Sequence, residues 1–86
     1  MTQQEIMTRA QQTAKDLTPM GIEAQIALHE KHLTHLALFD QEMGDLGALA
    51  REKSRQQIMD LLAINRQALM IRAQALSRHS KGVQSA

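Results

Sequence analysis

The sequence predicts an all-α protein that consists of a long antiparallel helical hairpin and a shorter N-terminal helix. Two copies of this chain are expected to form a helical bundle by dimerisation. Helix-forming residues dominate its 86 positions, and the apolar–polar alternation typical of strands is missing. Apolar residues recur at steps of three and four over 58–76, as on one face of a helix. Thr18-Pro19 and the Gly44–Gly47 segment divide the chain into three helical stretches.

The first helix is expected over about 3–16. Thr2 and Glu5 have the spacing of a capping box, in which Thr2 is the N-cap. The inner face of this helix is thin, with small or isolated apolar residues such as Ile6 and Ala10. We therefore expect it to depend on packing against another helix.

The second helix is expected over about 19–43. Thr18 is a favourable N-cap, and Pro19 occupies the first helical position, where a missing N–H costs nothing. Leu17 and Ile22 have the spacing of a hydrophobic staple around this start.

A short connection around Gly44 should make the second and third helices antiparallel neighbours. Gly44 can end the second helix with a positive φ, and Asp45 can cap the next helix, expected over about 47–78. One continuous kinked helix is the alternative. These helices form a single domain over 1–81, followed by a disordered tail over 82–86.

The third helix carries a contact line, which we call the seam, that includes two polar residues. Asn65 and Arg72 stand where apolar residues would pack best, and polar residues in a seam select register or oligomer state. Arg72 could extend to solvent or pair with a carboxylate across an interface. Leu76 lies beyond the expected end of the hairpin and needs a partner. The seam consists of Ile58, Leu62, Asn65, Leu69, Arg72 and Leu76.

Near the turn, the two long helices do not match. The second helix offers apolar side chains there, although Asp40 interrupts its central line, whereas the facing segment 50–57 is almost entirely polar. Each large apolar side chain left uncovered forfeits roughly 1.5–3 kcal/mol. We therefore predict that the first helix, a second copy or another protein covers this surface, and we favour a homodimer or larger complex over a three-helix monomer. The predicted contact residues are Leu36, Leu38, Phe39, Met43 and Leu46.

Charge is distributed unevenly along the chain. Residues 1–45 hold three basic and seven acidic residues, whereas 46–86 hold seven basic and two acidic residues. An acidic helix beside a basic helix explains this asymmetry. The alternative is nucleic-acid binding through Arg51, Arg55 and Arg66, although the chain offers no Tyr or Trp for base stacking.

Three histidines form the one cluster with metal-ligand chemistry. His29, His32 and His35 are weak candidates for binding Zn, Ni or Cu, because steps of three spread them around the helix surface. Helical zinc motifs generally use a four-residue step. We therefore expect no metal and no cofactor, and place His29 at the edge of the seam. If His29 is buried, acid should destabilise the hairpin.

Catalysis is not expected, since no nucleophile–base pattern or phosphate-binding glycine loop is present. Without cysteine there is neither a disulfide nor a thiolate site. The sequence lacks the apolar core of a signal peptide and any run long enough to span a membrane, so we expect a cytoplasmic protein.

The favoured function is a small protein–protein interaction module: an adaptor, inhibitor or small chaperone of bacterial, plasmid or phage type. No small-molecule or membrane partner is expected. A dimeric nucleic-acid-binding regulator is the first alternative, and a structural or assembly subunit is the second. With its Met-Thr-Gln-Gln-Glu start, the hairpin plan resembles small dimeric plasmid regulators in architecture only, so no residue role is carried over.

Overall fold

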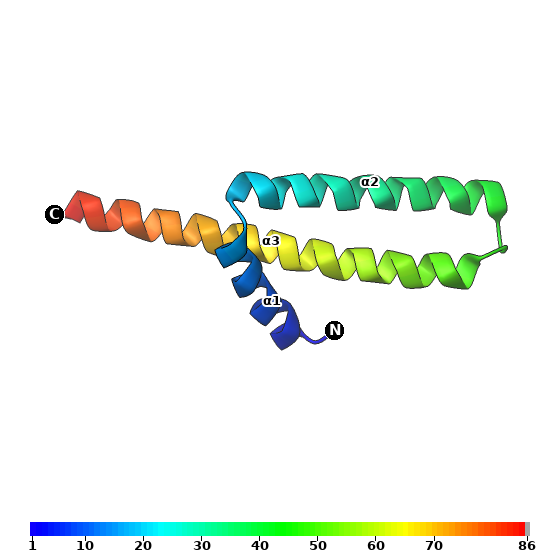
Figure 1. Cartoon of the computed structure of the whole chain (residues 1–86), viewed down its shortest axis with the longest axis horizontal. Coiled ribbons are helices and arrows are strands. Elements are labelled where there is room, and N and C mark those ends of the chain that lie inside the picture. The colour runs from blue at the N-terminus through cyan, green and yellow to red at the C-terminus, as the bar shows by residue number, and fades with distance from the viewer. Residues whose placement is uncertain (86) are drawn as a thin grey trace.

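A computed structural model describes the backbone of residues 1–85 and the side chains of residues 1–77. It consists of α1 (Gln3–Asp16), α2 (Pro19–Met43) and α3 (Ala48–Ser85) (Figure 1). No strand occurs among the described residues. The prediction of an all-α fold is confirmed.

The first two helices begin at the predicted threonine caps. The Thr2 hydroxyl accepts a hydrogen bond from the backbone N–H of Glu5 at 3.2 Å, and the Thr18 hydroxyl accepts one from Gly21 at 3.1 Å. Each bond satisfies one of the amide groups that the first turn of a helix leaves unpaired. Pro19 follows at the first helical position.

Two glycines form the turn between α2 and α3. Gly44 has a φ of 56° and Gly47 a φ of 74°, both in the region that disfavours side chains. The Arg51 N–H donates to the Gly47 carbonyl at 3.0 Å, so α3 begins at Ala48, one residue later than predicted. The two helices are separate and antiparallel, and they lie side by side (Figure 1).

α3 continues past its predicted end. It was expected to stop at about Arg78 and give way to a disordered tail over 82–86, but the helix extends to Ser85. Gly82 costs a helix only about 1 kcal/mol relative to alanine, and unlike proline it retains its N–H donor. The helix therefore ends later than expected, whereas disorder of the tail stays a prediction, and Ala86 lies outside the described residues.

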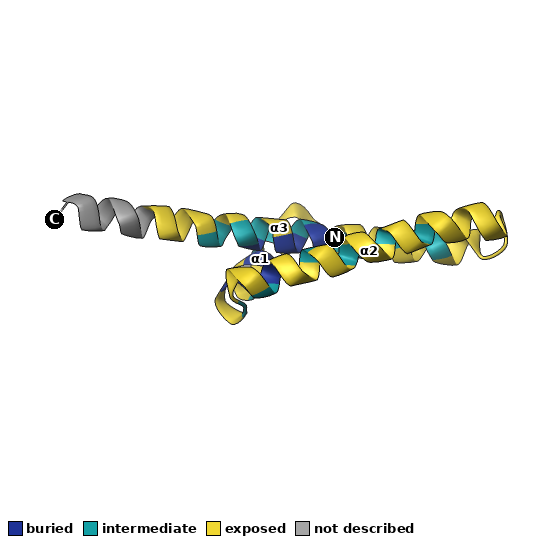
Figure 2. Ribbon diagram, turned by 90° about the horizontal axis from the view of Figure 1, so that it is seen from above, coloured by how far each residue is buried: buried dark blue, intermediate teal, exposed yellow. Residues whose placement is uncertain are grey.

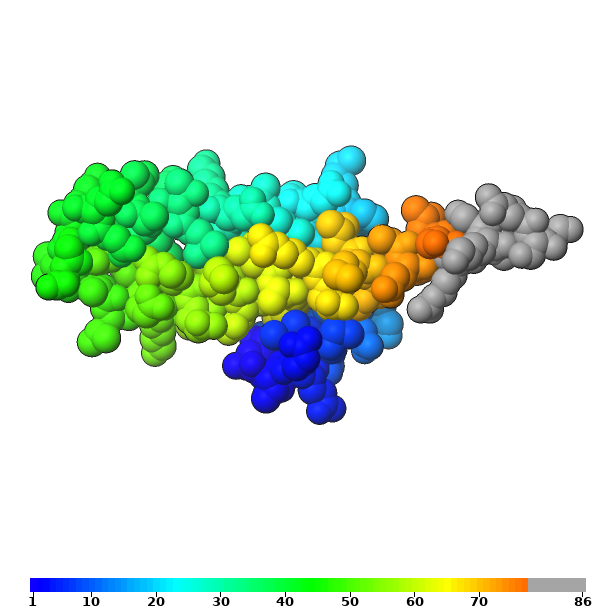
Figure 3. Space-filling view, turned by 180° about the vertical axis from the view of Figure 1, so that it is seen from behind, coloured from blue at the N-terminus to red at the C-terminus, as the bar shows by residue number. Residues whose placement is uncertain are grey.

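α1 packs against α3 at the open end of the hairpin and makes little contact with α2 (Figures 1 and 3). Alanines at the crossing let the two helix backbones approach closely, since Ala10 and Ala68 are fully buried. The core of the molecule lies at this junction. It contains Ala10, Ala14, Ile22, Ile64 and Ala68, flanked by Ile6, Leu17, Ile26, Leu69 and Ile71.

The molecule is elongated, with extents of 62 × 23 × 16 Å. Its radius of gyration is 16.8 Å, whereas a compact domain of this length has about 12 Å. Its accessible surface is 6451 Å², against roughly 5,100 Å² for a compact monomer of this mass. Burial is concentrated at the three-helix junction and declines toward the turn (Figure 2). Among the described residues, no helix is apolar over a length that could cross a bilayer.

Candidate interaction surface

An ion-pair cluster of Asp40, Arg51 and Arg55 holds the tip of the hairpin together. The Arg51 side chain is only 10% exposed, and its Nε donates to Asp40 Oδ1 at 2.6 Å. Its Nη1 donates to the Leu46 carbonyl at 2.6 Å, and its Nη2 donates to the Gly44 carbonyl. One guanidinium therefore joins α2, the turn and α3.

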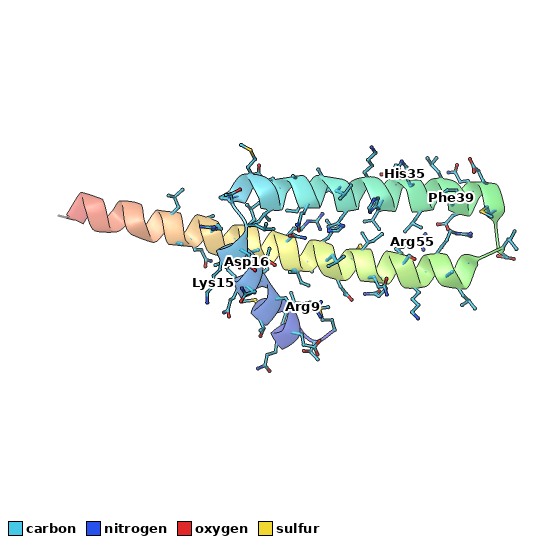
Figure 4. All side chains as sticks on the ribbon, in the orientation of Figure 1. Arg9, Lys15, Asp16, His35, Phe39 and Arg55 are labelled. Atoms are coloured by element: carbon cyan, nitrogen blue, oxygen red, sulfur yellow. The ribbon has the colours of Figure 1, made fainter. Side chains whose placement is uncertain are left out.

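Arg55 completes this tip ion-pair cluster. It donates to the second carboxylate oxygen of Asp40 and to Glu52 Oε2, the latter at 2.5 Å. Figure 4 shows Arg55 reaching from α3 into the space between the two long helices. Asp40 thus interrupts the apolar line of α2 but continues the contact between α2 and α3 through ion pairs. The antiparallel register, which sets Asp40 opposite Arg51, was the signal that sequence reasoning overlooked.

The third arginine of the predicted basic face also has an acidic partner. Arg66 Nη2 lies 3.2 Å from Glu30 Oε1, and both side chains are more than half exposed. Arg51, Arg55 and Arg66 therefore all pair with carboxylates of the same chain. These pairs neutralise much of the basic face expected from the sequence.

The apolar side chains near the turn form a surface that we call the tip patch: Leu36, Leu38, Phe39, Met43 and Leu46. Leu36 is half-buried. The other four are 45–71% exposed, because α1 packs at the opposite end of the hairpin. Leu49, on the first turn of α3 beside this patch, is 90% exposed and was not singled out in the sequence.

A shallow hollow lies on the outward side of the tip patch. It is lined by His35, Leu38, Phe39 and Glu42. Figure 4 shows His35 and Phe39 on the same stretch of α2, one turn apart. The surface therefore combines apolar groups with an imidazole and a carboxylate.

Arg72 acts at the other end of the hairpin. Its Nη2 donates to the Leu17 carbonyl at 2.7 Å, at the C-terminal cap of α1. The partner of Arg72 is thus a backbone carbonyl. At the C-terminal end of a helix, unpaired C=O groups and the helix dipole favour a cation. Neither of the two partners expected for Arg72, solvent and a carboxylate, is the one found. Leu76, one turn further along α3, is 68% exposed.

Asn65 is buried at 3% exposure within the seam. Its Nδ2 donates to the Leu61 carbonyl of its own helix at 2.9 Å, and its Oδ1 has no hydrogen-bond partner among the residues that the structure describes. A buried amide oxygen without a partner costs stability. Its effect on register or oligomer state stays a prediction.

The histidines do not converge on one point. His29 is half-buried, and within the described part of the chain its Nδ1 has no hydrogen-bond partner, whereas His32 and His35 are exposed. The rings of His29 and His32 lie 6.4 Å apart, edge to face. Among the described residues, no group of three His, Cys, Asp or Glu side chains could hold a metal ion.

Comparison with protein-family models, with curated proteins and with solved structures found no significant match. The chemistry of the chain's own surfaces therefore carries the functional argument.

Proposed function

We propose that this protein is a non-catalytic interaction module whose tip patch binds a helix of another polypeptide. The observation that carries the proposal is the exposure of large apolar groups near the turn of the hairpin, with Phe39 at 47% and Leu46 at 71%. Exposed apolar patches mark contact sites in soluble proteins. Anchors at helical spacing suit recognition between helices.

The tip ion-pair cluster supports this proposal because the residues that hold the hairpin closed differ from the residues proposed to bind a partner. Asp40, Arg51 and Arg55 hold α2 and α3 together through polar contacts. The apolar side chains of the tip patch are therefore not needed to close the hairpin. They remain available to a partner on a surface whose shape is already set, which lowers the entropic cost of association.

Within this proposal the protein works as an adaptor, an inhibitor or a small chaperone in the cytoplasm. A structural or assembly subunit would use the same surface, but its complexes would grow beyond a dimer with concentration. Nucleic-acid binding is less well supported, because Arg51, Arg55 and Arg66 already pair with carboxylates. Retardation of nucleic acid at low salt, lost steeply as salt rises, would favour it.

The test replaces Phe39 with a charged residue in the full chain. Phe39→Asp should abolish self-association or partner capture, because an anion would be desolvated at the centre of the contact. The helical circular dichroism signal should persist, since Phe39 lies outside the core at the junction. Gln41→Asp, on an exposed position of the same helix, is the matched control.

Mass in solution and site-specific photo-crosslinking from position 38 in the native host provide the readouts. Equal association by the wild type, Phe39→Asp and Gln41→Asp would overturn the proposal. So would crosslinks of the same yield from positions 38 and 41.

A further inference from the structure

A notch lies between α1 and α3, on the side of their crossing that faces away from the turn. It consists of two hollows that share Gln11, Ile71 and Ala75 and therefore adjoin each other. α3 continues past the start of α2 at this end of the molecule (Figure 1). The two sides of the notch are formed by Met7, Gln11 and Lys15 of α1 and by Gln67, Ile71 and Ala75 of α3.

Each side of the notch is a row of residues four positions apart. The row on α1 runs from Met7 to Lys15, and the row on α3 runs from Gln67 to Ala75. Each row is therefore roughly 12 Å long, at a rise of 1.5 Å per residue. Rows at this spacing form the ridges that interlock when helices pack. A groove between two such ridges has a suitable shape for a ridge of a third helix.

The notch combines apolar surface with two cations. Ala14 of α1 and Ile71 and Ala75 of α3 supply the apolar part. Lys15 and Arg72 line the same hollow. Among the described residues, no carboxylate lines either hollow. The chemistry that complements this surface is an apolar group with a carboxylate beside it.

Both cations can accept a further anionic partner. Lys15 is exposed and makes no ion pair within the described part of the chain. Arg72 Nη2 donates to the Leu17 carbonyl, but the buried Arg72 Nε has no hydrogen-bond partner among the described residues. A buried donor without a partner costs free energy, which a carboxylate oxygen of a ligand would offset.

The sequence of α3 also favours an acidic ligand at this end. Residues 61–86 include four Arg and Lys residues and no Asp or Glu. One of the four, Arg66, pairs with Glu30 of α2. The segment therefore has no acidic side chain of its own with which to neutralise the cations at the notch.

We propose that the notch docks an acidic amphipathic helix of another protein. An apolar side chain of this partner lies against Ile71 and Ala75, and a glutamate or aspartate about one helical turn away lies beside Lys15 and Arg72. The notch is at the opposite end of the hairpin from the tip patch, so the inference does not rest on the function proposed for that patch. With two separate surfaces the chain can bridge two partners, which is the action of an adaptor.

The shape and composition of the notch favour a polypeptide over other ligands. Pockets for small molecules enclose most of the ligand surface, whereas both hollows of the notch open to solvent. Single-stranded nucleic acid is bound through many phosphate contacts and through stacking on aromatic side chains. The described lining of the notch offers two cations and no aromatic ring.

Fluorescence anisotropy of the full chain with a designed peptide tests the docking. The labelled peptide has about 18 residues, enough to form a helix, with leucine and alanine on one face and glutamate along its edge. A second peptide carries lysine at every glutamate position. The acidic peptide should bind, and the lysine peptide should bind about tenfold more weakly or less. Added salt should weaken binding of the acidic peptide.

Two substitutions in the notch should weaken binding of the acidic peptide. Lys15→Glu reverses one cation and Ala75→Glu adds a carboxylate to the wall, so each should raise the Kd about tenfold or more. Lys31→Glu and Ala73→Glu are the matched controls, because both positions are exposed and neither lines the notch. Each control should change the Kd less than about twofold, since distant exposed charges are screened.

Two-dimensional NMR spectra of the labelled chain locate the contact. The acidic peptide should shift the amide signals of Gln11 and Ile71. The Arg72 Nε–H signal should move downfield when this group donates to a carboxylate. The signals of Phe39 and Leu46 in the tip patch should not move. Circular dichroism should show the same helicity in all four variants.

Each other outcome overturns the inference. Equal binding of the two peptides, or equal Kd values for Lys15→Glu and Lys31→Glu, excludes recognition of an acidic helix. Absence of binding at about 1 mM peptide excludes the notch as its docking site. Shifts confined to Phe39 and Leu46 place the peptide on the tip patch. Tighter binding of duplex DNA than of the acidic peptide assigns the cations to nucleic acid. None of these results decides the Phe39→Asp experiment, which tests the tip patch separately.

Discussion

At the scale of single residues, two arginines on α3 perform the same task at opposite ends of the hairpin. Arg51 and Arg72 are 21 residues apart, which is three heptads, so they lie on the same face of α3. Arg51 donates to carbonyls that follow α2, and Arg72 donates to the Leu17 carbonyl that follows α1. Both use the several donors of a guanidinium to satisfy helix C-terminal carbonyls.

The tip ion-pair cluster leads to a prediction about stability. Arg51→Met keeps the apolar stem but removes every hydrogen bond to Asp40, Gly44 and Leu46, so it should lower the free energy of unfolding by about 2 kcal/mol. Arg55→Met should cost less than about 1 kcal/mol, because that side chain is 29% exposed and its ion pairs are solvated. Urea unfolding followed by circular dichroism measures both. Equal losses would contradict the central role of Arg51.

Residue-scale predictions from the sequence succeeded where the partner was a few residues away and failed where it was a backbone group far away in the sequence. Thr2 and Thr18 were identified as caps because the donor lies three residues away. The partner of Arg72 is 55 residues away and is a carbonyl, which every residue carries. No side-chain pattern could therefore have identified it.

At the scale of elements, α1 is held by a close crossing over α3. Ala10, Ala14 and Ala68 keep the two backbones near each other, and the first and third of these are fully buried. The sequence indicated that α1 depends on packing, but it did not locate the contact. Small residues on a helix mark a close approach only once the facing helix is known.

Ala68→Leu should therefore release α1. The added carbons have no space at the crossing, so the variant should lose about 1–3 kcal/mol of stability. Hydrogen exchange should accelerate along α1 while α2 and α3 remain protected. Ala73→Leu, at an exposed position on α3, is the control. Uniform protection of α1 in Ala68→Leu would contradict this role of the crossing.

The ends of the helices could likewise be predicted where they depend on residues close in the sequence. Gly44 predicted the end of α2, and the short connection predicted the antiparallel hairpin, because positive φ and chain length are local constraints. The end of α3 was predicted at about Arg78 but lies at Ser85, because the polar residues after Arg78 weaken a helix without breaking it. The exposure of Leu38 and Phe39 was foreseen because the facing segment is polar.

At the scale of the whole molecule, the chain is elongated, its core lies where α1 crosses the hairpin, and a group of exposed apolar side chains lies at the turn. The junction of the three helices holds nearly all of the fully buried side chains described, such as Ile22, Ile64 and Ala68. The tip is closed by charged groups and exposes Phe39 and Leu46. The residues that form the core and the tip-patch residues proposed to bind a partner therefore lie in different parts of the molecule. Association at the tip need not disturb the core.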